Sequence, residues 1–149
     1  MEAQISQSRH IVPPSRLWWA ILLGIFLATA ANVVFFIVMT EVFEMPMLFP
    51  NQPVSELAPL GVSDVILFSV IFSTGASIVF VIVGSLSKRP ARTFLIISLV
   101  VLAISLALPL KIPSPPATMA AKFSLITMHI IGATIVVGIL ILLGSSREE

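Results

Sequence analysis

Residues 123–143 read FSLITMHIIGATIVVGILILL and decide the fold of this chain. The stretch holds 21 residues and contains no Asp, Glu, Lys or Arg. Since a helix rises about 1.5 Å per residue, this segment is long enough to cross the roughly 30 Å hydrocarbon core of a bilayer. Three further apolar stretches precede it. The sequence therefore predicts a polytopic membrane protein.

The composition agrees with this interpretation. Only 10% of the 149 residues are charged, whereas a soluble domain carries about 25%. Cysteine is absent, which excludes disulfides, thiolate metal sites and cysteine nucleophiles. The formal net charge is +1 and the chain has no run of Lys and Arg, so we expect no nucleic-acid partner.

Four predicted membrane helices give the fold class, an all-α membrane protein built as an antiparallel four-helix bundle. The single membrane domain consists of four spans and two polar tails, with the spans at about residues 17–39, 65–86, 93–110 and 121–143 and the tails at 1–16 and 144–149. A signal-peptide cleavage site is suggested by Ala28, Thr29 and Ala30, but the apolar run continues well beyond them. We therefore interpret the first span as a retained anchor.

Residues 40–63 are predicted to form a loop, because four prolines interrupt them. The loop also contains several apolar residues, which suggests that it lies against the membrane surface. Ser63 and Asp64 are predicted to cap the second helix.

The distribution of basic residues predicts the orientation of the bundle, since cytoplasmic loops are enriched in Lys and Arg. Six basic residues lie in the tails and in the 87–92 turn, against two in the other loops: Arg9, Arg16, Lys88, Arg89, Arg92 and Arg147, against Lys111 and Lys122. We therefore expect both termini in the cytoplasm and the protein in the cytoplasmic membrane.

Six residues are expected to anchor the helices at the headgroup level: Arg16, Trp18, Trp19, Lys88, Arg89 and Arg92.

Polar side chains inside lipid are costly unless they face the interior of a bundle. Small or polar residues recur at every fourth position of the first two spans: Gly24, Ala28 and Asn32, then Ser69, Ser73 and Ser77. If these faces converge, Asn32, Ser73 and His129 form one polar cluster in the outer half of the bundle, with Ser98 slightly deeper. In the last span, Gly132 and Gly138 are expected to let another helix approach.

Two interpretations of this cluster stay open. In the first, Asn32 and His129 bond each other or a backbone carbonyl and lock the helices together. Interhelical bonds of this kind contribute about 0.6–2 kcal/mol and specify register. In the second, the cluster binds a ligand or moves a proton.

Several chemistries can be set aside. A haem ligated by two histidines needs two intramembrane His, and the spans contain one, His129. The chain has no HExxH zinc motif, no GxSxG nucleophile motif, no Walker loop and no dinucleotide fingerprint. We therefore assign no catalytic residue and expect neither a cofactor nor a metal.

Three functions from different classes remain. The first is a non-catalytic membrane protein that binds a lipid or hydrophobic molecule, or serves as an accessory subunit of a membrane complex. The second is a small transporter or proton-coupled carrier that uses the polar cluster. The third is a membrane-embedded enzyme acting on a lipid or quinone, with His129 as general base. The expected partners are membrane lipids, together with other membrane subunits or further copies of the chain.

Several short motifs also resemble a known family. They are LWWAILLG and ATAANVVFF in the first span, the turn SKRPART, and TMHIIGA in the last span. The chain resembles small bacterial four-span membrane proteins that are classified as a domain of unknown function and are common in Actinobacteria and Chloroflexota. The resemblance covers most of residues 17–143. It implies a four-helix integral membrane fold and assigns no activity.

Overall fold

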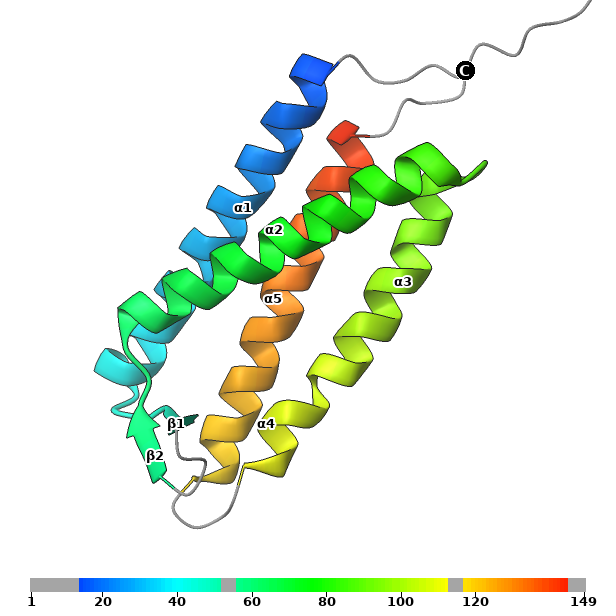
Figure 1. The fold of residues 1–149 in the computed structure, drawn as a ribbon. Coiled ribbons are helices and arrows are strands. Elements are labelled where there is room, and N and C mark those ends of the chain that lie inside the picture. Colours follow the sequence, from blue (N-terminus) through cyan, green and yellow to red (C-terminus); the bar gives the residue numbers. More distant parts are fainter. Residues whose placement is uncertain (1–13, 52–55, 113–116, 145–149) are drawn as a thin grey trace, which may run out of the picture.

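The computed structural model describes residues 14–51, 56–112 and 117–144. Within these segments, four helices are long and apolar enough to cross a membrane. In chain order the helices are α1 (Pro14–Ile37), α2 (Val62–Leu86), α3 (Pro90–Ser105) with its short continuation α4 (Ala107–Lys111), and α5 (Met119–Gly144). The chain reverses direction from each long helix to the next (Figure 1). The structure thus confirms the predicted antiparallel four-span bundle.

Helix α5 lies between α1 and α3 in the bundle, and α2 crosses over them (Figure 1). The most extensive interface joins α1 to α5. It is close because α1 buries a residue at every fourth position, mostly small ones: Ala20, Gly24, Ala28, Asn32 and Phe36. A Cβ atom built on Gly24 would lie 3.8 Å from Ile139 Cγ2, which is ordinary van der Waals contact. Small residues of this kind let two helix backbones approach within lipid.

Two apolar clusters form the core. The first lies at the end of the bundle where α1 leads into α2, and consists of Phe36, Met47, Val65, Ile112, Ala117, Leu125 and Met128. The second lies toward the opposite end and consists of Ala28, Phe80, Val83, Phe94, Val136 and Leu140. In the second cluster the rings of Phe80 and Phe94 meet edge to face, with their centroids 4.9 Å apart.

The connection between α1 and α2 contains regular structure where the sequence predicted a loop. A π-helical turn, η1 (Val38–Val42), has Phe43 as its C-cap, and the next residue, Glu44, has a φ of 48° in the left-handed region. Two short antiparallel strands follow, β1 (Leu48–Asn51) and β2 (Glu56–Pro59). The prolines of the hairpin are tolerated because each strand of a two-stranded sheet is an edge. The loop prediction for residues 40–63 was wrong in this respect.

This connection folds onto the end of the bundle. Met47 is only 2% exposed and packs in the first apolar cluster, and its carbonyl accepts a hydrogen bond of 2.7 Å from the Leu60 N–H. Val42 and Phe43, by contrast, remain exposed. The apolar residues of the connection are therefore divided between capping the bundle and facing its surroundings.

Local hydrogen bonds cap the first turns of α2 and α5. Gly61 is the N-cap of α2, and the Asp64 Oδ2 atom accepts a 2.8 Å bond from the Gly61 N–H. The predicted N-cap position at Ser63 and Asp64 was wrong, since both residues lie inside the helix, although Asp64 does cap the helix start from its position N3. At the start of α5, Thr118 Oγ1 accepts a 3.1 Å bond from the Ala121 N–H, as an N-cap hydroxyl does.

Pro109 causes the break between α3 and α4. Pro109 has no N–H to donate to the carbonyl of Ser105, and its ring crowds that carbonyl. The α-helix accordingly stops at Ser105 and resumes at Ala107. Together the two segments give a 22-residue span, Pro90–Lys111.

Candidate functional site

Asn32 lies where α1, α2 and α5 meet. Its side chain is buried, and its Nδ2 atom donates a 3.1 Å hydrogen bond to Ser69 Oγ on α2. On α5, a Cβ atom built on Gly132 would lie 3.1 Å from the same Nδ2 atom. Along their helices these three residues fall between the two apolar clusters. We call Asn32, Ser69 and Gly132 the polar junction.

The polar junction is incompletely hydrogen-bonded. Among the described residues, Asn32 Oδ1 and Thr29 Oγ1 are buried and have no hydrogen-bond partner. A buried polar group left without a partner costs about 1–3 kcal/mol. At that cost the two unpaired oxygens offset the whole of the roughly 0.6–2 kcal/mol that a bond such as Asn32–Ser69 contributes. Thr29 was not predicted to belong to a polar cluster, because a lone Thr in an apolar helix gives no distinctive signal.

Ser73 and His129 form hydrogen bonds within their own helices. The carbonyl of Ser73 accepts a 2.8 Å bond from Ser77 Oγ, and His129 Nδ1 donates a 2.8 Å bond to the carbonyl of Leu125. Among the hydrogen bonds of the described residues, none joins Asn32 to Ser73 or to His129. Asn32 instead pairs with Ser69, one turn away from Ser73 on the same serine face.

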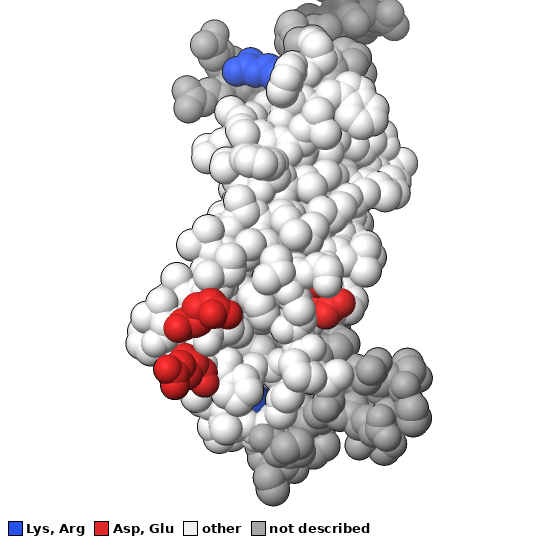
Figure 2. Space-filling view, turned by 90° about the vertical axis from the view of Figure 1, so that its left-hand side faces the viewer, with Lys and Arg blue, Asp and Glu red and all other residues white. Residues whose placement is uncertain are grey.

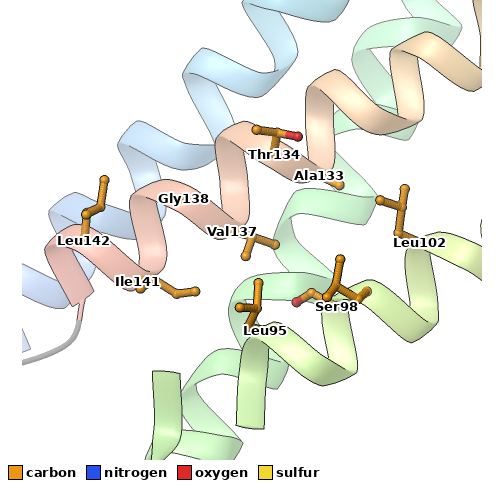
Figure 3. Close-up of a pocket in the computed structure, with 10 residues that line it drawn as sticks. Leu95, Ser98, Leu102, Ala133, Thr134, Val137, Gly138, Ile141 and Leu142 are labelled. Carbon is orange, nitrogen blue, oxygen red and sulfur yellow. The ribbon is translucent and has the colours of Figure 1, made fainter. Parts of the chain in front are cut away.

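Ser98 lies elsewhere, in a groove between α3 and α5 with a volume of about 400 Å³. In Figure 3, Leu95, Ser98 and Leu102 of α3 face Ala133 and Val137 of α5. The groove is lined by Leu95, Ser98, Leu99, Leu102, Ala133, Thr134, Val137, Gly138, Ile141 and Leu142. We call this hollow the α3/α5 groove.

Two features explain why the α3/α5 groove stays open. Helix α3 packs against α5 much less extensively than α1 does. In addition, a Cβ atom built on Gly138 would meet nothing within 4 Å. The expectation that Gly138 lets another helix approach was therefore wrong, whereas for Gly132 the close approach is present.

The α3/α5 groove combines hydrocarbon walls with two hydroxyl groups, those of Ser98 and Thr134. A second, wider hollow of about 630 Å³ lies over α1 and has no polar side chain in its lining. It is lined by Leu27, Ala30, Ala31, Val34, Phe35, Val38 and Ile135. The α3/α5 groove is thus the hollow better suited to a molecule that carries both hydrocarbon and a hydrogen-bonding group.

Charged side chains lie at the two ends of the bundle and leave a broad apolar band between them (Figure 2). We call the end with the α2–α3 turn and the start of α1 the basic end; its described charges are Arg16, Lys88, Arg89 and Arg92, all exposed. The other, acidic end carries Glu41, Glu44 and Asp64, together with Lys111 and the buried Lys122. Trp18 and Trp19 project from the first turns of α1 and are 64% and 73% exposed. The six predicted anchors therefore all lie at the basic end.

This arrangement defines a multi-pass integral membrane protein, with four apolar helices packed into one bundle and charges confined to its ends. The chain belongs to a family of unknown function, DUF6069, whose model matches residues 12–145. The family match confirms the resemblance to small four-span membrane proteins of unknown function. Comparisons with curated proteins and with solved structures found no match.

Proposed function

We propose that this protein is a non-catalytic membrane protein that binds a lipid-soluble molecule in the α3/α5 groove. The groove itself is the observation that carries the proposal. Its volume of about 400 Å³ falls within the roughly 300–1,000 Å³ of typical ligand sites, and its lining is hydrocarbon with two hydroxyl groups. A hydrocarbon chain from the surrounding bilayer fits this chemistry.

The hydrogen bonds of the polar residues support a non-catalytic role. A carrier would use Asn32, Ser73 and His129 together, and an enzyme would use His129 as general base. The Asn32 amide, however, bonds Ser69 on a neighbouring helix, and His129 Nδ1 bonds its own helix. We therefore assign the polar junction to helix packing. If the protein is instead an accessory subunit, the groove would hold a helix of a partner protein. The same experiment distinguishes this role from lipid binding.

The test is native mass spectrometry of protein extracted gently with its lipids. Gly138→Leu places a branched side chain in the groove, and its Cβ atom would meet nothing within 4 Å. Gly75→Leu is the matched control, because a Cβ atom on Gly75 also meets nothing within 4 Å and Gly75 lies outside the groove. We expect a reproducible lipid adduct on the wild type and on Gly75→Leu, and its loss from Gly138→Leu. Equal adducts on all three proteins would contradict the proposal. A stoichiometric complex with another protein would instead identify an accessory subunit.

A further inference from the structure

We infer that the molecule in the α3/α5 groove is an anionic phospholipid, with one acyl chain in the groove and its phosphate beside Arg92. This inference rests on the proposed function and names its ligand class. The observation behind the inference is the position of the positive charge of Arg92, directly beyond the end of the groove.

Arg92 and the groove lie on one side of α3. Leu95, Leu99 and Leu102 line the groove and follow Arg92 by three, seven and ten residues. Residues at such spacings share a helix face. Side chains on a helix tilt toward its N-terminus, which for α3 is the basic end. The exposed Arg92 guanidinium therefore reaches toward the headgroup level, about one helical turn beyond Leu95.

The α2–α3 turn adds two more positive charges next to Arg92. Ser87 Oγ lies 2.9 Å from Thr93 Oγ1 and accepts a 3.1 Å bond from the Arg89 N–H. These bonds fix the short turn against the start of α3. The side chains of Lys88 and Arg89 remain exposed on the outside of the turn.

The charge at this end is not balanced within the described chain. The acidic side chains that the structure describes all belong to the opposite end: Glu41, Glu44 and Asp64. A phosphate diester would offer Arg92 a negatively charged partner, and an acyl chain attached to it would descend from the headgroup level into the hydrocarbon groove. Arginine pairs with phosphate through two parallel N–H donors, which favours a defined headgroup position.

The experiment titrates detergent-purified, delipidated protein with phosphatidylglycerol or with phosphatidylcholine of identical acyl chains, and counts one-to-one complexes by native mass spectrometry. We expect tighter binding of phosphatidylglycerol. Arg92→Gln should weaken phosphatidylglycerol binding roughly fivefold, the factor expected for one basic residue near an anionic lipid surface, and should leave phosphatidylcholine binding unchanged. Arg92→Lys keeps the charge and should keep most of the preference.

Arg16→Gln is the matched control, because it removes an exposed arginine from the same end but on α1. Helix α1 lies across α5 from α3 (Figure 1). The Arg16→Gln variant should bind phosphatidylglycerol like the wild type. Equal losses in Arg16→Gln and Arg92→Gln, or no preference in the wild type, would overturn the headgroup assignment. If Gly138→Leu still loses both lipids in that case, the groove remains the binding site. If Gly138→Leu binds both lipids normally, the proposed function fails as well.

Discussion

The amide nitrogen of Asn32 lies 3.1 Å from the point that a Cβ atom on Gly132 would occupy. The absence of a side chain at position 132 is therefore what lets α5 pack over Asn32 while the amide reaches Ser69 on α2. Three helices are held in register at one point by a single hydrogen bond and a single glycine.

Gly132→Ala should destabilise the bundle, because the new methyl group would lie 3.1 Å from the Asn32 amide nitrogen and must displace it from its position beside Ser69. Overpacking of this kind costs about 1–3 kcal/mol. Unfolding in mixed detergent measures the change. Gly75→Ala is the control, since its methyl group meets nothing within 4 Å, and it should be neutral or slightly stabilising. Equal stability of the two variants would contradict the close packing at Gly132.

Asn32 and Ser69 should be energetically coupled. A double-mutant cycle with Asn32→Ala and Ser69→Ala should give a coupling free energy of about 0.6–2 kcal/mol, the range for hydrogen bonds between membrane helices. Ser77→Ala offers a comparison, because the Ser77 hydroxyl bonds the carbonyl of Ser73 in its own helix. Additive effects of the Asn32 and Ser69 changes would show that the bond contributes nothing to stability.

His129→Leu should lower the melting temperature in detergent less than Asn32→Leu does. The hydrogen bond of His129 Nδ1 goes to Leu125 on the same helix, so its loss separates no helices. Asn32→Leu removes the bond to α2 and places a bulkier branched side chain against Gly132. A larger loss for His129→Leu would mean that the histidine, and not the polar junction, holds the bundle together.

Met47→Ala should loosen the hairpin from the end of the bundle, because Met47 is 2% exposed in the first apolar cluster. Truncating a buried Met to Ala costs about 2–5 kcal/mol. Hydrogen exchange of the Leu60 N–H, which bonds the Met47 carbonyl, reports the loosening directly. Met119→Ala, at a 56% exposed position, should change neither quantity. Unaltered exchange in Met47→Ala would show that the side chain does not hold the hairpin.

The distribution of charge predicts that the basic end faces the cytoplasm. The chain contains no cysteine, so single-cysteine variants need no prior substitution. Ser15→Cys marks the basic end and Ser63→Cys marks the acidic end, and both positions are exposed. A membrane-impermeant maleimide added to intact cells should label Ser63→Cys alone. Labelling of Ser15→Cys instead would reverse the orientation.

The four helices could be predicted from the sequence because each is a long apolar run, and a run of that length in lipid must satisfy its backbone as a helix. The partner of Asn32 could not be predicted. Ser69, Ser73 and Ser77 share one face of α2, and the register that selects Ser69 depends on how the apolar clusters pack on either side.

The α3/α5 groove could not be predicted from the sequence either. A glycine inside a membrane helix is compatible with close packing, as at Gly132, and with open space, as at Gly138. Which of the two occurs depends on how closely the neighbouring helix approaches, and no residue type reports that distance. Ser98 was singled out as polar, but only the structure places it in a groove with Thr134.

The most direct test of lipid binding in the α3/α5 groove is photocrosslinking in vesicles that contain a phospholipid with a diazirine in its acyl chain. Peptide mapping then locates the labelled residues. We predict that label concentrates on groove residues such as Leu99, Val137 and Ile141, relative to Ile71, Ile78 and Ile82 on the exposed face of α2. Label spread evenly over both surfaces would contradict a specific site and leave the groove as ordinary lipid-facing surface.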